Sequence, residues 1–270
     1  MTGEPPLARR AAAEFVGTGA LVAVVVGSGI QATGLSQDVG VQLLANSLAT
    51  VFGLGVLILL LGPVSGAHFN PVVTLAAWWT ARRGGEGPGP REVAAYVPAQ
   101  IAGAIGGAVL ADTMFAEPPV AWSTHERWAP HLWLGEVVAT AGLVLLILGL
   151  VRVGRAHFAP VAVASYIGAA YWFTSSTSFA NPAVTIGRAF SDTFAGIDPA
   201  SVPLFVAAQL VGLAVGAGLL VLLFGGPGSR ARARPAGDPV ASPALPAPPA
   251  RPAPPAPPAP PAPRIKDLLP

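Results

Sequence analysis

The sequence predicts an all-α membrane protein with six transmembrane helices and two half-length helices, arranged as two copies of a three-span unit in opposite orientations. Three observations predict this class. The composition is too apolar and too poor in charge for a typical soluble domain. Six apolar stretches are long enough to cross a bilayer, and two shorter ones each contain an Asn-Pro pair at their start. The order of these segments occurs twice along the chain.

The composition excludes several classes of protein. Hydrophobic residues make up 53% of the 270 residues and charged residues only 10%, against about 25% charged in soluble domains. The segment from residue 227 onward contains five Arg, one Lys and two Asp, so its formal net charge is +4. Since the whole chain has a net charge of +2, residues 1–226 carry a net charge of −2. The basic residues therefore form no stripe for nucleic-acid phosphates. The absence of Cys removes disulfides and thiol chemistry.

Each predicted span follows from its length. A bilayer core of about 30 Å needs about 20 apolar residues in a helix. Stretches of that length lie at about 10–31, 39–62, 92–112, 131–151, 158–177 and 203–225. The stretches at about 69–80 and 181–190 are only half as long. Asn is a favourable N-cap and Pro is favoured at the first helical position, so Asn70-Pro71 and Asn181-Pro182 are predicted to begin two short helices.

Arginine residues predict the orientation of the spans. They lie before the first span, between the second and third, between the fourth and fifth, and in the tail: Arg9, Arg10, Arg82, Arg83, Arg91, Arg152, Arg155 and six Lys/Arg after residue 227. The connection 32–38 has none, 113–130 has Arg127 and 178–202 has Arg188. By the positive-inside rule both termini are cytoplasmic, as an even number of spans requires.

An internal repeat supports the inverted arrangement. Glu14 in the first span has a counterpart in Glu136 of the fourth, and GAHFNPVVTLA (66–76) resembles SFANPAVTIGR (178–188). PAQIAGAIGGAV (98–109) likewise resembles AAQLVGLAVGAG (207–218). Three spans per copy make the second copy inverted relative to the first, as in many transporters and channels. We expect a channel domain over 1–226, with repeats at about 8–112 and 131–226.

The two short helices predict a site for neutral solutes. Irregular backbone at membrane depth is tolerated where it is buried in protein or lines a water-filled cavity. In an inverted repeat the two helices meet near the midplane with their N-termini facing, and each N-terminus carries roughly half a positive charge. Such a point repels cations and protons, while Asn70 and Asn181 offer amide donors to a polar solute. This is the chemistry of a channel.

The two Asn-Pro motifs, SGAHFNPVVTL and FANPAVTIGR, with the repeat around them over about residues 8–226, resemble the aquaporins of the major intrinsic protein family. The resemblance implies a right-handed bundle of six helices and two half-helices, one pore per subunit and a homotetramer. It also implies roles for three sets of residues. The pore midplane comprises Asn70, Pro71, Val72, Asn181, Pro182 and Ala183; structural supports are Glu14, Glu136, Gln100, Gln209 and His68; helix-crossing contacts are Gly103, Gly107, Gly212 and Gly216.

The sequence departs from the family pattern at the outer constriction. Family members usually carry arginine three residues after the second Asn, where this chain has Val184. Arg188 follows one turn later; we expect its side chain to face the neighbouring loop at Asp192, with partial compensation for the missing pore arginine as the alternative. A second departure is Val72, where the first motif usually has Ala; its extra methyl groups are expected to narrow the midplane or tilt the half-helix.

Counting from the two Asn residues predicts the rest of this filter. Thr50 lies twenty residues before Asn70, with Phe52 as the alternative if the connecting loop is shorter. The other members are Ala169, Ser178 and Val184. This set is small and uncharged, so it predicts a wide opening. At about 7 Å and an effective dielectric constant of about 20, loss of one positive charge removes about 2.4 kcal/mol of repulsion against a monovalent cation.

The predicted function is a passive channel for small uncharged solutes. The arginine-free filter resembles bacterial aquaporins associated with arsenic resistance, which implies arsenous acid and water as solutes. A general water or glycerol channel is the alternative. A coupled transporter would depend on Glu14 or Glu136, and a non-conducting scaffold would use the tail. No metal, cofactor or catalytic constellation is recognisable, so an enzyme is not expected.

The segment 227–270 predicts a different physical state. PAPPARPAPPAPPAPPAP repeats every three residues and has no apolar core, which favours polyproline II or disorder. RPAPPAP (251–257) matches an SH3-type ligand pattern. We expect a cytoplasmic extension of the channel domain, with an SH3-like domain as one candidate partner.

Overall fold

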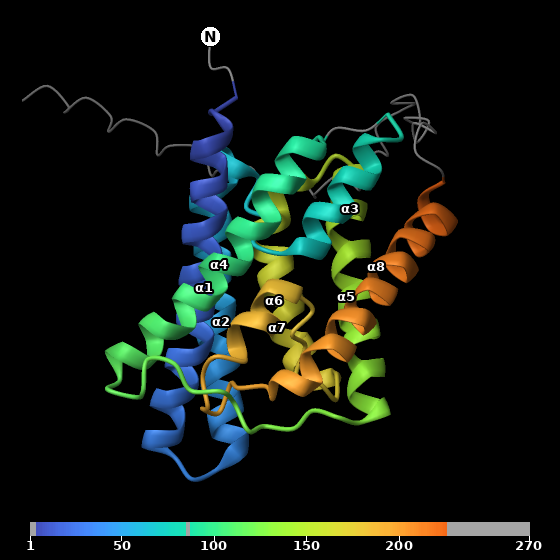
Figure 1. Cartoon of the computed structure of the whole chain (residues 1–270). Coiled ribbons are helices and arrows are strands. Elements are labelled where there is room, and N and C mark those ends of the chain that lie inside the picture. Colours follow the sequence, from blue (N-terminus) through green and yellow to red (C-terminus); the bar gives the residue numbers. More distant parts are fainter. Residues whose placement is uncertain (1–3, 85–86, 226–270) are drawn as a thin grey trace, which may run out of the picture. The chain divides into compact units, whose positions relative to one another are not determined.

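The computed structural model describes residues 4–84 and 87–225, and this part of the chain is helical with irregular connections (Figure 1). The α-helices follow the predicted order: α1 (Leu7–Leu35), α2 (Val39–Ser65), α3 (Pro71–Ala81), α4 (Pro90–Met114), α5 (Pro130–Arg152), α6 (Ala159–Phe173), α7 (Pro182–Arg188) and α8 (Val202–Phe224). Two 3-10 turns, Ala156–Phe158 and Pro199–Ser201, precede α6 and α8. The predicted tail 227–270 lies outside the described residues.

Five helices are long and apolar enough to cross a membrane: α1, α2, α4, α5 and α8 with its preceding turn. The predicted fifth span, 158–177, is too long, because α6 ends at Phe173 after 15 residues. The hydroxyl groups that follow take local partners: Thr174 donates to the Ala170 carbonyl at 2.7 Å and Ser175 to the His131 carbonyl at 2.6 Å. Hydroxyl residues that bond nearby backbone favour turns over helix. At about 1.5 Å per residue, α6 rises about 22 Å.

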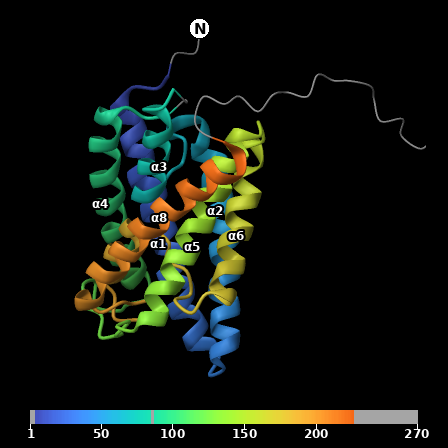
Figure 2. The ribbon, with the colours of Figure 1, turned by 90° about the vertical axis from the view of Figure 1, so that its right-hand side faces the viewer.

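The helices pack as two related sets. Helix α1 packs against α2 and α4, and α5 packs against α6 and α8, while α2 and α6 join the two sets. Each half-helix crosses to the other set, α7 against α4 and α3 against α8. In both views the first residues of α1 and the last residues of α8 lie at the same face (Figures 1 and 2). The described ends thus agree with an even number of crossings.

Glycines allow the closest helix contacts, as the sequence predicts. A Cβ atom on Gly107 would lie 2.1 Å from the carbonyl oxygen of Gly19, and one on Gly103 would lie 2.2 Å from that of Phe15. The second set repeats the arrangement, since a Cβ atom on Gly216 would lie 2.5 Å from the Ala141 carbonyl oxygen. Small residues let helix backbones approach where lipid provides no hydrophobic driving force.

A buried carboxylate holds the loop before α3. Oε1 of Glu14 accepts from the Ser65 hydroxyl at 2.6 Å and from the backbone N–H of His68 at 3.0 Å. Oε2 accepts from the N–H of Phe69 at 2.6 Å and from the Gln100 amide at 2.8 Å. Four donors to one carboxylate satisfy a charged group that is costly to bury alone.

The second repeat contains the matching arrangement. Glu136 accepts from the N–H groups of Phe179 at 2.9 Å and Ala180 at 2.8 Å, and from the Gln209 amide at 2.6 Å. Gln209 also donates to the Thr185 hydroxyl at 2.8 Å, as Gln100 does to Thr74 at 2.9 Å. Each glutamate therefore connects a long helix to the loop that carries an Asn-Pro pair.

These bonds maintain an unfavourable backbone. Phe69 and Ala180, the residues before each Asn, have φ of 49° and 47°, and Ala67 and Ser178 have φ of 50° and 52°. A left-handed conformation costs a non-glycine residue about 1–2 kcal/mol. Such strain persists only where the surroundings fix it. The glutamates fix it here, and the same conformation recurs at equivalent positions of both loops.

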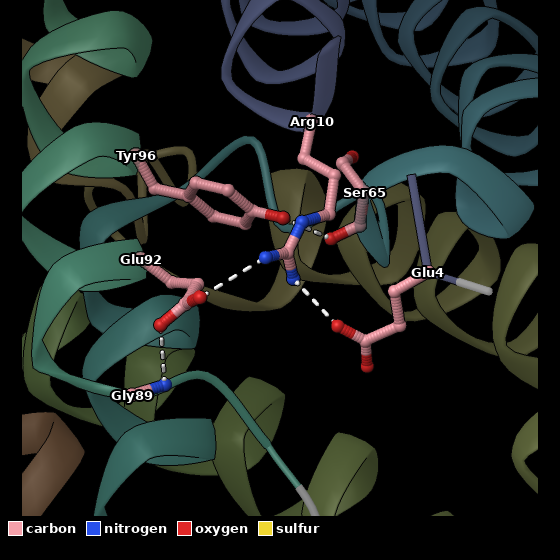
Figure 3. Close-up of polar contacts among 6 residues, drawn as sticks. All are labelled: Glu4, Arg10, Ser65, Gly89, Glu92 and Tyr96. Atoms are coloured by element: carbon pink, nitrogen blue, oxygen red, sulfur yellow. Dashed lines mark hydrogen bonds and ion pairs between the residues drawn. The ribbon is translucent and has the colours of Figure 1, made fainter. Parts of the chain in front are cut away.

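A polar cluster near the start of α1 connects α1, α2 and α4 (Figure 3). Arg10 pairs with Glu92 at 3.0 Å and with Glu4 at 3.3 Å. Glu92 also accepts from the N–H of Gly89 at the start of α4, at 3.0 Å. Tyr96 donates to the Ser65 carbonyl at 2.8 Å, which extends the cluster to the loop held by Glu14.

The glycine contact between α1 and α4 generates a testable prediction. Gly107→Ala places a methyl group against the Gly19 carbonyl, and overpacking of this kind costs about 1–3 kcal/mol. We expect a lower unfolding temperature in detergent, measured by tryptophan fluorescence. Gly106→Ala is the matched control, because a Cβ atom there meets nothing within 4 Å. Equal unfolding temperatures for the two variants would contradict the close packing.

The buried carboxylates generate a second prediction. Glu136→Gln turns an amide N–H₂ toward backbone donors, and each buried group left unpaired costs about 1–3 kcal/mol. We expect a clear loss of thermal stability and slower solute entry into proteoliposomes. The exposed Glu117 supplies the control Glu117→Gln, which removes a carboxylate without changing a buried bond. If Glu136→Gln unfolds at the temperature of this control, the support assigned to Glu136 is wrong.

Candidate functional site

A cavity of about 910 Å³ lies between the two sets of helices, and every α-helix except α4 contributes to its wall. The cavity has an α7 end and an α3 end, each close to the half-helix of that label. The α7 end is lined by Thr50, Tyr171, Ser178, Val184 and Arg188. The α3 end is lined by Thr80, Gly84, Gly87, Arg152 and Ala156. Between them the wall is mostly aliphatic.

Asn70 and Asn181 lie side by side in the wall between the ends. Each caps its own half-helix, since Asn70 Oδ1 accepts from the N–H of Val72 and Asn181 Oδ1 from that of Ala183, both at 3.0 Å. Each amide nitrogen donates to the opposite loop at 2.8 Å, Asn70 to the Ala180 carbonyl and Asn181 to that of Phe69. An amide nitrogen has two N–H donors, so each Asn keeps one for a molecule in the cavity.

The two loops line the cavity with backbone acceptors. The N–H groups of His68 and Phe69 face Glu14, and those of Phe179 and Ala180 face Glu136. In a trans peptide the carbonyl points away from the N–H, so the preceding carbonyl oxygens point away from the glutamates. The loop residues that carry them line the cavity. Acceptors of the loops therefore approach the two Asn donors from either side.

The other predicted midplane residues do not line the cavity. Pro71, Val72, Pro182 and Ala183 are buried among the helices, and the wall contains none of them. Val72 is fully buried, and it is the next residue, Val73, that lines the cavity. The methyl groups of Val72 thus do not narrow the cavity, contrary to one of the two effects that the sequence predicts.

Three of the four predicted filter residues meet at the α7 end: Thr50, Ser178 and Val184. The structure corrects the fourth, because Ala169 is exposed on the outer side of α6 and Tyr171 lines the cavity instead. Two residues along a helix of about 3.6 residues per turn rotate the side chain by about 200°. The offset from Asn181 therefore selects the wrong face of α6.

Tyr171 and Thr50 form one side of the cavity wall at the α7 end and contact each other through their hydroxyl groups. Their hydroxyl oxygens lie 3.2 Å apart, and Thr50 also donates to the Asn46 carbonyl at 2.8 Å. The alternative residue Phe52 is 69% exposed and is not part of the wall. The hydroxyl of Ser178 is buried and has no hydrogen-bond partner among the described residues. The oxygen itself is almost fully covered, so it faces the surrounding side chains and not the open part of the cavity.

Arg188 occupies a place that the sequence does not predict. Its side chain lines the cavity, and its Nε donates to the carbonyl of Ala195 in the following loop. The expected contact with Asp192 does not form, because Asp192 binds the N–H of Thr124 at 2.8 Å. This bond from Thr124 lowers the pKa of Asp192 below its ordinary value. Asp192 therefore connects the loop after α7 to the loop that contains Thr124, and the Arg188 side chain lies in the cavity wall without a bond to Asp192.

His68 has a structural position beside the cavity. Its Nδ1 lies 3.0 Å from the Thr74 hydroxyl, and its ring packs edge-on against Tyr96 with ring centres 5.6 Å apart. Within residues 4–84 and 87–225 no three His, Cys, Asp or Glu side chains are grouped as metal ligands. His68 thus joins the hydrogen-bonded network around Glu14 and Gln100.

Sequence reasoning missed three groups of this site. Thr74 and Thr185 each follow their Asn by four residues and donate to its carbonyl, at 3.2 and 2.8 Å. The repeat of Thr in NPVVT and NPAVT is a signal that could have identified them. Tyr171 has no counterpart in the other repeat, so the sequence holds no comparable signal for it.

Comparisons with known proteins agree with this geometry. The family model described as major intrinsic protein matches residues 2–178. The chain is 52% identical to the aquaglyceroporin AqpS of Rhizobium meliloti over 206 residues, which are 76% of this chain and 86% of the relative. It is 31% identical to Aquaporin Z of Brucella melitensis over 76% of this chain and 93% of that protein.

A solved structure has the same fold. The aquaglyceroporin from Plasmodium falciparum superposes with a TM-score of 0.59 at 23% identity, over 82% of this chain and 96% of that one. The family model covers more than half of this chain, and the similarity to AqpS extends over three quarters of it. On these grounds, and with two Asn-Pro half-helices meeting in a membrane-spanning bundle, the chain belongs to the major intrinsic protein family.

Proposed function

We propose that the chain is a passive channel for small uncharged solutes, with a wide α7 end that admits neutral metalloid acids such as arsenous acid as well as water. Members of the family are channels and not enzymes. Relatives named as an aquaglyceroporin, an aquaporin and a glycerol uptake facilitator support water and glycerol-type molecules as the solute class. The finer proposal, metalloid acids, depends on the residues of the α7 end.

The single observation that carries the proposal is the pair of Asn donors in the middle of the cavity, where the rest of the wall is mostly aliphatic. A neutral solute exchanges hydrogen bonds with water for bonds to these donors and to the loop carbonyls. A cation would lose its hydration shell without a carboxylate among the described residues of the wall to replace it, which is costly in such surroundings. The site therefore favours molecules that carry hydroxyl groups and no charge.

The α7 end supports solutes larger than water. Val184 offers a small apolar surface, while Thr50 and Tyr171 offer hydroxyl groups. Arsenous acid is neutral at pH 7 and has three hydroxyl groups, so it matches Asn donors together with hydroxyl side chains. A filter of this composition holds a compact polyhydroxyl molecule by several weak bonds and releases it readily.

We also propose that the α7 end faces outside and that both termini are cytoplasmic. The supporting observation is the excess of arginine in the connections at the opposite face, by the positive-inside rule. The plasma membrane and a homotetramer with one pore per subunit are proposed from family membership. For the segment 227–270 the proposal stays a cytoplasmic extension, with an SH3-like domain as a candidate partner for RPAPPAP.

Exchange of Val184 tests the filter. Val184→Arg fills the α7 end with a bulky charged side chain, and we expect entry of arsenous acid and glycerol into proteoliposomes to fall at least about tenfold while water entry persists. That change corresponds to about 1.4 kcal/mol in the barrier. Stopped-flow light scattering under inward gradients of each solute measures the rates. Val184→Leu is the control, because it adds volume without charge.

The outcomes separate the candidate functions. Entry of water alone in the wild type, unaffected by Val184→Arg, would make the chain an ordinary water pore and the filter assignment wrong. Acceleration of solute entry by a proton gradient would favour a coupled transporter. Wild-type vesicles that admit no solute faster than empty vesicles would contradict the channel and favour a scaffold.

A further inference from the structure

Arg188 lies one turn beyond Val184 on the same face of α7. Residues four apart are neighbours on one face of a helix of about 3.6 residues per turn. Both side chains line the cavity and both are 5% exposed. The chain thus places a guanidinium group at the α7 end although residue 184 is valine.

Two contacts fix this guanidinium. Nε donates to the Ala195 carbonyl, and Cζ lies 3.5 Å from the centre of the Phe179 ring. Phe179 is itself held edge-on against Phe205, with ring centres 5.3 Å apart. A cation over an aromatic face is attracted by the ring electrons, and more strongly when both are removed from water. The position of the charge is therefore defined by packing as well as by a hydrogen bond.

Arg127 shares this support but not the cavity. Its Cζ lies 4.9 Å from the centre of the Phe179 ring, and its Nε donates at 3.1 Å to the carbonyl of Gly196, next to Ala195. The wall of the cavity does not include Arg127. The two arginines thus have equivalent packing partners, and only Arg188 faces the path of a solute.

The charge on Arg188 is not neutralised by a neighbouring carboxylate. In the described part of the chain, neither arginine has a carboxylate oxygen within 4.0 Å. The terminal nitrogens of Arg188 make none of the hydrogen bonds found in that part, and the buried Ser178 hydroxyl at the same end is also unpaired. A buried unpaired charge is costly, and an ionisable group at membrane depth usually has a functional partner.

We propose that Arg188 is the residue that excludes cations at the α7 end, and that its terminal nitrogens bind the oxygens of a neutral polyhydroxyl solute there. This inference rests on the proposed function and deepens it. Moving the charge one turn along α7 keeps its field at the opening while Val184 keeps the side chains small. At about 7 Å and an effective dielectric constant of about 20, one charge lowers cation occupancy about fifty-fold.

The test compares ion leak with solute entry in proteoliposomes of the full chain. Proton leak is followed with an internal pH dye under a clamped potential, and glycerol entry by light scattering. Arg188→Met and Arg188→Gln remove the charge, and Met keeps contact with the Phe179 ring. We expect the ratio of proton leak to glycerol entry to rise about ten- to fifty-fold in both. Arg127→Gln is the matched control and should keep the wild-type ratio.

A double variant distinguishes charge at the opening from damage to the fold. In Val184→Arg/Arg188→Gln the charge returns one turn away, and the proton leak should fall back toward the wild-type value. Neutral variants that incorporate normally and stay tight to protons would overturn the inference, as would an equal leak in Arg127→Gln. If neither neutral variant incorporates, Arg188→Lys decides: it keeps the charge but loses the Nε bond, so wild-type exclusion is expected and a leak overturns the inference. Glycerol entry in the wild type reports separately on the proposed function.

Discussion

Two buried carboxylates hold the loops that bring the Asn donors and the backbone acceptors to the cavity. Glu14 and Glu136 each accept two consecutive backbone N–H groups from the loop before an Asn-Pro pair. By binding the N–H side of these peptides, they hold the loops in a left-handed conformation and turn the carbonyl side toward the cavity. The Asn side chains can then exchange hydrogen bonds with the opposite loop. Without these two acceptors, the hydrogen bonds that offset the cost of the left-handed backbone in both loops would be lost.

The resulting cavity separates two tasks. The Asn pair and the loop carbonyls provide the same contacts in both repeats, so the middle of the cavity is nearly symmetric. The α7 end differs from the first repeat in the residues that line it, which include Tyr171, Ser178, Val184 and Arg188. Selection by hydrogen bonding and selection by size and charge thus depend on different residues, and one can vary without the other.

Much of the fold follows from the sequence, because apolar length, Asn-Pro pairs and the internal repeat are local or periodic signals. The five long helices and the two half-helices are readable in this way, whereas the supporting role of Glu14 and Glu136 is implied by the family resemblance. The end of α6 cannot be predicted in this way. It depends on the carbonyl groups with which the Thr174 and Ser175 hydroxyls form hydrogen bonds, and the one bound by Ser175 belongs to the distant residue His131. The expected position of Ala169 in the cavity wall is wrong for another reason: a shift of two residues along a helix selects the opposite face of that helix. The contact of Arg188 with Phe179 depends on a loop whose path the sequence does not specify.

The crossed bonds from Asn70 to Ala180 and from Asn181 to Phe69 have a mechanical consequence. They join the two inverted repeats at the centre of the membrane, where a rocking transporter would need its halves to separate. Alternating access would break both bonds at once and leave two amides and two carbonyls unpaired in an apolar wall, at a cost of about 1–3 kcal/mol for each group. In transporters the symmetry of two inverted repeats allows the repeats to move against each other, whereas in this chain the two crossed hydrogen bonds hold the repeats together.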